Sequence, residues 1–112
     1  MTDVKGKWAL VTGANRGIGY RIAKFLAGKG CNLILHSRSL EHTAAVLAEV
    51  RAMGVEAYDV AAELSDLSQV QKMIDEINAK VKPKTFLLIF LKLYKIQQIL
   101  HIKGKIFTMI YY

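Results

Sequence analysis

The chain has 112 residues, which is enough for one domain with a buried core and too few for two. Its one cysteine excludes an internal disulfide, and charged residues precede the first apolar run, so we expect no secretory leader and a reducing, cytoplasmic location. The net charge of +7 is unevenly placed: residues 82–112 hold six Lys and no acidic residue, so the charge indicates nothing about partners of residues 1–81.

The first predicted strand, residues 8–12, runs into a glycine-rich turn with the sequence Thr12-Gly13-Ala14-Asn15-Arg16-Gly17-Ile18-Gly19. A tight turn between a strand and a helix directs backbone N–H groups and the positive end of the helix dipole at one point, which favours a phosphate. Glycine permits the turn, lets a diphosphate reach the backbone and lets the helix pack closely. A Walker-type phosphate loop is excluded, because the required Gly-Lys-Ser/Thr ending is absent.

Helices and strands alternate after this turn. Helices are predicted at 18–29, 40–53 and 66–81, with strands between them at 31–36 and 55–60. The predicted buried faces are Ile18, Ile22, Phe25 and Leu26 in the first helix and Val70, Met73, Ile74, Ile77 and Val81 in the third. Ser39 is expected to cap the second helix, and Ser65 or Asp66 the third. The predicted class is α/β, an incomplete doubly wound parallel sheet of three to four strands with helices on both faces.

The character of the sequence changes after residue 81. Residues 83–89 are interpreted as a fourth strand, and from Phe90 onward the chain consists almost entirely of Ile, Leu, Phe, Lys, Tyr and Gln. Most of these residues are encoded by A/T-rich codons, as expected when translation continues in a wrong frame. We therefore divide the chain into a half-domain at 1–89 and a basic apolar tail at 90–112.

The spacing Gly-x-x-x-Gly-x-Gly behind a Thr differs from the Gly-x-Gly-x-x-Gly of most dinucleotide-binding folds and resembles the glycine segment of the short-chain dehydrogenase/reductase family. The resemblance covers residues 5–81 and extends to Ile89, and it is greatest to 3-oxoacyl-acyl-carrier-protein reductases. It implies a Rossmann-like half-domain that binds NADP(H), from an oxidoreductase that transfers a hydride between a nicotinamide cofactor and a carbonyl or alcohol substrate. The family's fourth strand runs into Asn-Asn-Ala-Gly, which is absent here, so residues 90–112 are interpreted as foreign to the family.

The residues after the second strand indicate which cofactor is preferred. An acidic residue about 20 positions beyond the glycines normally binds the adenosine ribose and selects NAD. This chain has Ser37 and then Arg38 there, so that Arg38 and Arg16 supply two guanidinium groups for a 2′-phosphate. Basic residues at these two places resemble the NADP(H)-preferring members, and the alternative is that both arginines are solvated surface groups.

Further cofactor contacts follow from the resemblance. Glu63 and Leu64 fall where the family carries an Asp and an aliphatic residue that recognise adenine, and Glu63 is otherwise an exposed carboxylate before a helix. Asn15 is assigned either to phosphate binding or to stabilising the turn. The predicted cofactor-binding residues are Gly13, Asn15, Arg16, Gly17, Ile18, Gly19, Ser37, Arg38, Glu63 and Leu64.

No catalytic residue is predicted in this chain. The resemblance implies that catalysis uses a Tyr, a Lys four residues later, a Ser and an Asn, all in the second half of a family member. Tyr20 and Lys24 have that spacing, but they follow the glycine turn directly, away from the nicotinamide end of a bound cofactor, and we interpret the match as chance. The histidines lack metal-ligand spacing, so no metal site is predicted and structural or solvated roles are assigned to His36, His42 and His101.

Three functions are consistent with these features. The first is the cofactor-binding half of an NADP(H)-dependent oxidoreductase, inactive without its second half. The second is a noncatalytic NADP(H)-binding sensor module, and the third is membrane-surface or nonspecific nucleic-acid binding through the tail.

Partners follow from the same features. We expect a nicotinamide dinucleotide, a small carbonyl or alcohol substrate only in a full-length relative, and no specific nucleic acid. No transmembrane span is expected, because no apolar run approaches the length of about 20 residues that a membrane span needs. In the family, a further strand covers the edge of the fourth strand, and later helices form the oligomers. We expect both to be missing here, which predicts a bare sheet edge and low solubility.

Overall fold

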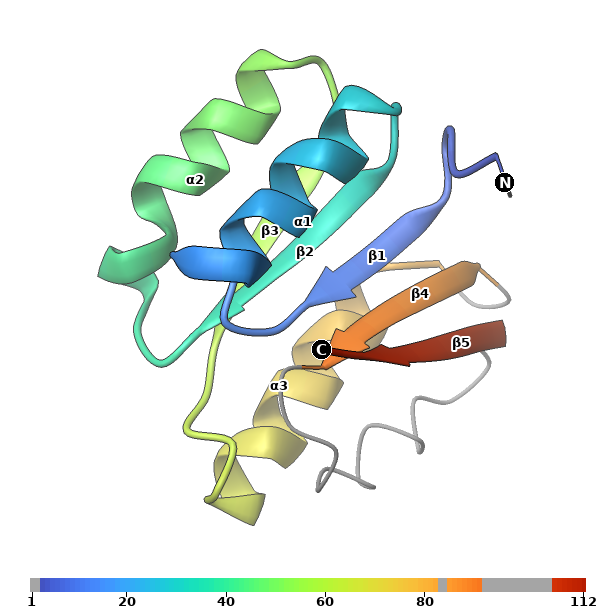
Figure 1. Cartoon of the computed structure of the whole chain (residues 1–112). Helices are drawn as coiled ribbons and strands as arrows, with labels where there is room; N and C mark the ends of the chain where they lie inside the picture. Colours follow the sequence, from blue (N-terminus) through green and yellow to red (C-terminus); the bar gives the residue numbers. More distant parts are fainter. Residues whose placement is uncertain (1–2, 83–84, 92–105) are drawn as a thin grey trace.

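Figure 1 shows a layered α/β arrangement in the computed structural model, which describes residues 3–82, 85–91 and 106–112. Within these residues, five strands form one parallel sheet in the order β3-β2-β1-β4-β5. The elements are β1 (Trp8–Val11), α1 (Gly17–Gly28), β2 (Asn32–Ser37), α2 (Leu40–Ala52), β3 (Ala57–Ala61), α3 (Leu67–Lys80), β4 (Phe86–Leu91) and β5 (Ile106–Tyr111). The predicted class, a parallel sheet with helices on both faces, is confirmed.

The two faces of the sheet carry different helices: α1 and α2 lie on one face and α3 on the other (Figure 1). From β1 to β3 the chain steps outward strand by strand, and it then returns past β1 to β4. Because crossovers between parallel strands are right-handed, this reversal of direction moves α3 to the opposite face. The carboxyl ends of β1 and β4 therefore border the point where the strand order reverses, which is where ligands bind in sheets of this kind.

Alternate residues of the central strands face the two helical layers. Toward α3, Leu10 and Ile34 pack against the buried face of that helix, which consists of Val70, Met73, Ile74 and Ile77. Toward α1 and α2, the neighbouring positions Val11 and Leu35 are buried in a second cluster. The buried face predicted for the third helix is confirmed, including Val81.

α1 packs on the sheet through small residues, which differs from the prediction. Its buried residues are Gly19, Ala23, Leu26 and Ala27. Ile18 and Phe25, which were predicted on the buried face, are 61% and 53% exposed. Small residues spaced by four let the helix backbone approach the strands closely, and this moves the larger apolar side chains to the flank of the contact. The prediction was wrong at these two positions because it counted bulky apolar residues and overlooked the stripe of Gly and Ala.

β5 is the main element that the sequence did not predict. It pairs in parallel with β4, from Phe86 opposite Ile106 to Leu91 opposite Tyr111, and the Tyr112 N–H donates to the Leu91 carbonyl at 2.9 Å. The expectation of a bare edge on the fourth strand is therefore wrong. Most positions of β5, with the sequence Ile-Phe-Thr-Met-Ile-Tyr, are β-branched or aromatic, a composition that favours strands.

The boundary predicted after Ile89 falls inside β4, which continues beyond it. The Phe90 carbonyl accepts the Thr12 N–H at 3.0 Å and the Thr12 hydroxyl at 3.2 Å, so Phe90 contributes to the centre of the sheet. The foreign origin of residues 90–112 stays a prediction, and 92–105 lie outside the described residues. Among the helices that the structure describes, none is long and apolar enough to cross a membrane.

Candidate functional site

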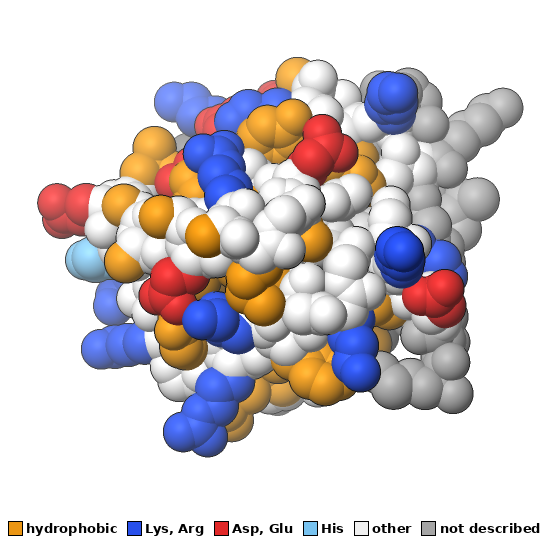
Figure 2. All heavy atoms as spheres, turned by 90° about the horizontal axis from the view of Figure 1, so that it is seen from above, with side chains coloured by type: hydrophobic (Ala, Val, Ile, Leu, Met, Phe, Trp, Pro, Cys, Tyr) orange, Lys and Arg blue, Asp and Glu red, His pale blue; other side chains and the backbone are white. Residues whose placement is uncertain are grey.

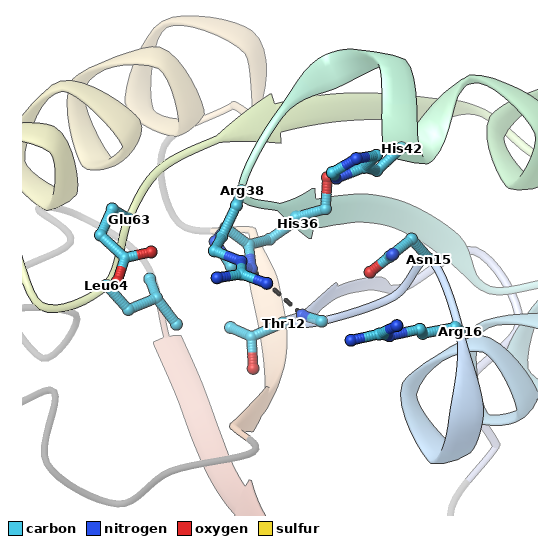
Figure 3. Close-up of a pocket in the computed structure, with 10 residues that line it drawn as sticks. Thr12, Asn15, Arg16, His36, Arg38, His42, Glu63 and Leu64 are labelled. Atoms are coloured by element: carbon cyan, nitrogen blue, oxygen red, sulfur yellow. Dashed lines mark hydrogen bonds between the residues drawn. The ribbon is translucent and has the colours of Figure 1, made fainter.

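A cavity of about 440 Å³ opens at the carboxyl ends of β1, β2 and β3 (Figure 3). Three segments that are far apart in the sequence line it, with the residues Thr12, Gly13, Asn15, Arg16, His36, Ser37, Arg38, His42, Glu63 and Leu64. Most of the predicted cofactor-binding residues therefore share one cavity. The others, Gly17, Ile18 and Gly19, form the start of α1 and are not among its lining residues. Thr12, His36 and His42 are lining residues that the sequence did not assign to the site.

The glycine turn ends at an uncapped helix. Gly13 and Gly17 have φ angles of 60° and 63°, in the left-handed region that favours glycine. Arg16 is the N-cap residue of α1, its side chain makes no capping hydrogen bond, and the first turn holds no acidic residue. The N–H groups of Gly17, Ile18 and Gly19 have no acceptor among the described residues. The amino end of α1 therefore offers unpaired donors and the positive end of the helix dipole, which suit an anion.

Gly19 is the position where α1 meets the turn. A Cβ at Gly19 would lie 2.3 Å from the carbonyl oxygen of Gly13 and 2.9 Å from its carbon. The hydroxyl of Tyr112, which donates to the Thr12 carbonyl, would be 2.7 Å away. The sequence predicted a close contact of the helix with the strand at Gly19, and the structure places the tightest contact on the backbone of the turn.

His36 connects the turn to the end of β3. Its Nδ1 accepts the Gly13 N–H at 3.1 Å, drawn as a dashed line in Figure 3, and its Nε2 lies 2.8 Å from the Ala62 carbonyl. Because a carbonyl only accepts, Nε2 carries the proton and Nδ1 is free to accept. Burial lowers the pKa of His36, which is only 3% exposed, and the imidazole is therefore neutral near pH 7. The sequence assigned a structural or solvated role to this residue, and the structure shows a buried, hydrogen-bonded one.

The charged side chains of the cavity come from opposite sides. In Figure 3 the guanidinium groups of Arg16, from the glycine turn, and Arg38, from the end of β2, both point toward the space between them, and Glu63 lies on the far side of Arg38. Elsewhere, on the face shown in Figure 2, Lys and Arg are scattered among acidic and apolar side chains. The two arginines thus bring positive charge to a cavity that holds one carboxylate.

The segment between β2 and α2 is held by its own hydrogen bonds. The buried hydroxyl of Ser37 donates to the Ser39 carbonyl at 2.5 Å. Ser39 is the N-cap residue of α2, as predicted, but its hydroxyl makes no capping hydrogen bond and has no partner among the described residues. Asp66, in contrast, caps α3 by accepting the Ser68 N–H at 3.0 Å, as the sequence predicted. Ser37 and Arg38 both line the cavity, and because the Ser37 hydroxyl proton is used within this segment, Arg38 is the stronger hydrogen-bond donor that it offers to a ligand.

Tyr20 and Lys24, whose spacing matches a catalytic pair, contact a carboxylate instead. The Tyr20 hydroxyl donates to Glu49 at 2.7 Å, and the Lys24 ammonium lies 2.7 Å from the same oxygen, so the three side chains join α1 to α2. The hydrogen bond to Glu49 raises the pKa of Tyr20, which is the direction opposite to that required of a catalytic acid at neutral pH. Neither residue lines the cavity. The structure therefore gives this pair a role in helix packing.

Replacement of Tyr20 by phenylalanine is expected to lower the melting temperature by about 2–4 °C, because the hydroxyl bridge between the helices is lost. Thermal unfolding of Tyr20→Phe, Glu49→Ala and the double variant tests this. The double variant should lose little more than Glu49→Ala alone, since both changes remove the same hydrogen bond. Hydrogen bonds from Lys24 and Tyr20 lower the pKa of Glu49, so this contribution is present above its ordinary value of 4.5 and is lost at lower pH. Fully additive losses would contradict the bridge.

The family model described as short chain dehydrogenase matches residues 7–89. A fatty acyl-CoA reductase from Acinetobacter baylyi is 36% identical over 86 residues, which is 77% of this chain and 29% of that protein. A 3-oxoacyl-acyl-carrier-protein reductase from Staphylococcus aureus is 43% identical over 72 residues, which is 63% of this chain and 29% of that protein. The chain thus spans under a third of the length of these relatives.

Solved structures agree with this sequence match. A short-chain dehydrogenase/reductase from Mycobacterium marinum superposes with a TM-score of 0.71 and 25% identity, covering 81% of this chain and 37% of that one. A metagenomic short-chain oxidoreductase, solved in complex with NADP, gives a TM-score of 0.68 and 33% identity, covering 78% of this chain and 39% of that one. The residues that the family model matches, 7–89, include every residue that lines the cavity.

Proposed function

Because the chain belongs to the short-chain dehydrogenase family, as an N-terminal fragment that resembles 3-oxoacyl-acyl-carrier-protein reductases, we propose that it binds NADP(H) in the cavity described above. It carries the nucleotide-binding part of an oxidoreductase. The observation that carries the proposal is the convergence of unpaired N–H donors at the start of α1 with two guanidinium groups at one cavity. In a full-length relative, the bound cofactor would supply a hydride to a carbonyl carbon or accept one from an alcohol carbon.

The diphosphate is assigned to the amino end of α1. The N–H groups of Gly17, Ile18 and Gly19 satisfy the phosphate oxygens, and the helix dipole adds to the attraction. Asn15, in the cavity wall beside Arg16, provides a further polar contact. The fit of this segment to a diphosphate is supported by its lack of any protein cap, which leaves the N–H groups of the exposed residues Gly17 and Ile18 accessible to phosphate oxygens.

The adenosine half is assigned to the ends of β2 and β3. Arg38 and Arg16 hold the 2′-phosphate through charge-assisted hydrogen bonds, and no acidic residue stands at the end of β2 to repel it. Leu64 and the neighbouring Glu63 form the wall against which the adenine lies. The Glu63 carboxylate already accepts the Ser65 hydroxyl at 2.9 Å, which limits its freedom to bind the base.

The experiment compares binding with turnover. Trp8 is the one tryptophan, so its emission and energy transfer to dihydronicotinamide report binding. NADPH is expected to bind at least about tenfold more tightly than NADH, because one charge-assisted contact is worth roughly 1.5–3 kcal/mol. No reduction of a carbonyl substrate is expected from the chain alone.

The outcomes separate the functions that share this cavity. Turnover of NADPH with a simple ketone would contradict the assignment of an inactive half-domain. Binding without turnover fits both the half-domain and a noncatalytic sensor module, and the gene sequence downstream of this segment distinguishes the two. Absence of binding by either cofactor to folded protein overturns the proposal.

A further inference from the structure

We propose that His36 is a positioning residue that holds the glycine turn in its dinucleotide-binding conformation, and that it does so only as the neutral imidazole. The inference rests on the proposed function, because the ligand whose binding it controls is the diphosphate of a nicotinamide dinucleotide. It adds to that function a residue and a pH dependence that the glycine motif alone does not contain.

Two successive amides of the turn are anchored on His36. The Gly13 N–H donates to its ring Nδ1 at 3.1 Å, and the Ala14 N–H donates to its backbone carbonyl at 2.8 Å. The opposite edge of the ring is fixed by the Ala62 carbonyl, 2.8 Å from Nε2. The ring therefore spans from the glycine turn to the end of β3, and its orientation sets where the turn begins.

Protonation reverses one of these contacts. An imidazolium carries N–H groups at both ring nitrogens, so Nδ1–H would face the Gly13 N–H, and two donors would meet at 3.1 Å. Little solvent reaches the ring to replace the bond, because His36 is 3% exposed. The Gly13 amide would then lose its acceptor, and the turn would have to move to avoid the new proton.

The surroundings of the ring set the balance between its two forms. Burial lowers the pKa of His36, whereas the hydrogen bond with the Ala62 carbonyl and the nearby Glu63 carboxylate raise it. The other charged or titratable groups at the cavity are Arg16, Arg38 and His42, and beyond Thr12 lies the Tyr112 hydroxyl. On the opposite layer, the buried residues of α3 are uncharged and apolar, and they are Val70, Met73, Ile74 and Ile77. Because the pKa of His36 is lower in the folded state than its ordinary value of 6.5, the folded state keeps its full stability above about pH 6.5, where the imidazole is neutral in both states. This stability is lost progressively as the pH falls below that value, because the unfolded chain binds the proton more readily.

The test is the affinity for NAD⁺, measured by calorimetry from about pH 8 to pH 5 on the full chain. NAD⁺ is stable in acid and has no 2′-phosphate that titrates in this range. Because protonation of the His36 imidazole opposes binding, the NAD⁺ affinity is expected to fall by up to tenfold per pH unit below the pKa of this imidazole. Thermal unfolding at each pH verifies that the protein is folded.

Two variants with amide side chains separate the two edges of the ring. In His36→Asn the amide oxygen lies where Nδ1 was, so an acceptor for Gly13 remains and nothing titrates; its affinity at pH 8 should be within about threefold of the wild type and independent of pH. In His36→Gln the longer side chain reaches the position of Nε2 and leaves Gly13 unpaired, so its affinity should be lower by about tenfold at every pH. His42→Asn is the matched control for the other cavity imidazole and should retain the wild-type pH profile.

The outcomes are distinct. A pH-independent affinity in the wild type, or an acid loss that persists in His36→Asn, overturns the role of His36 while leaving the proposed function intact. If the loss of NAD⁺ affinity at low pH disappears in His42→Asn, the titrating group is His42, and the role of His36 is overturned as well. If neither NAD⁺ nor NADP⁺ binds at any pH, the proposed function itself fails.

Discussion

Replacement of Gly19 by alanine is expected to weaken cofactor binding, with a loss of NADPH affinity of roughly 30- to 100-fold. The new Cβ would lie 2.3 Å from the Gly13 carbonyl oxygen and 2.9 Å from its carbon, distances that side chains do not tolerate. Both atoms belong to the backbone of the turn, so relief requires α1 or the turn to shift. A shift of either separates the Gly17 and Ile18 donors from the diphosphate, and each hydrogen bond to a charged group is worth roughly 1.5–3 kcal/mol.

The same substitution is expected to lower the free energy of unfolding by about 1–3 kcal/mol, as overpacking does in a tight contact. Chemical denaturation measures this effect separately from affinity. Gly28→Ala is the matched control, since it adds the same methyl group to the other end of α1, where the Cβ would meet only the Met53 methyl group at an ordinary 3.6 Å. Gly28→Ala should bind NADPH as the wild type does. A Gly19→Ala variant with unchanged affinity would show that the diphosphate does not depend on this contact.

Arg38→Asp is expected to reverse the cofactor preference. The substitution removes the guanidinium at the end of β2 and places there a carboxylate that repels a 2′-phosphate and accepts hydrogen bonds from the ribose hydroxyls of NADH. We expect the NADPH affinity to fall by roughly 100-fold and the NADH affinity to stay equal or rise, because a repulsive group adds to the lost attraction. Direct titration of both cofactors into both proteins measures the order.

The control for this prediction must change the charge by the same amount elsewhere. Lys72→Asp does so on an exposed position of α3, outside the cavity. It should leave the ratio of the two affinities unchanged, whatever the general effect of net charge on anion binding. Equal affinities for NADPH and NADH in both the wild type and Arg38→Asp would refute the assignment of Arg38 to the 2′-phosphate.

Local sequence patterns were sufficient to predict most of the fold. Strong periodicity and glycine or polar punctuation identified the strand–helix alternation through residue 81, and parallel pairing followed from that alternation. The buried face of α1 was predicted less well, because Ala23 and Ala27 carry little hydrophobic signal although their size lets the helix approach the sheet. β5 was not predicted, because the composition of residues 90–112 was interpreted as a sign of sequence foreign to the family. The same residues, many of them β-branched or aromatic, also favour a strand.

The candidate site was predictable wherever the offset from the glycine turn determines the position. Arg38 and Glu63 fall at such offsets, and the structure brings both to the cavity that Arg16 lines. His36 was not assigned to it, since its role depends on two hydrogen bonds to residues 23 and 26 positions away. A polar residue at the end of an otherwise apolar strand, directly before the cofactor-selecting position, is the signal that would have identified it.

The hydrogen bond between the Thr12 hydroxyl and the Phe90 carbonyl joins residues 78 positions apart, and it anchors the start of the glycine turn. During synthesis, the turn and its helix leave the ribosome long before the strand that supplies this carbonyl. Because β1 pairs with β4 across three intervening helices, the chain must close a long loop before this anchor forms, which slows folding. Competence to bind a ligand is thus acquired late, when the central strand receives its second neighbour.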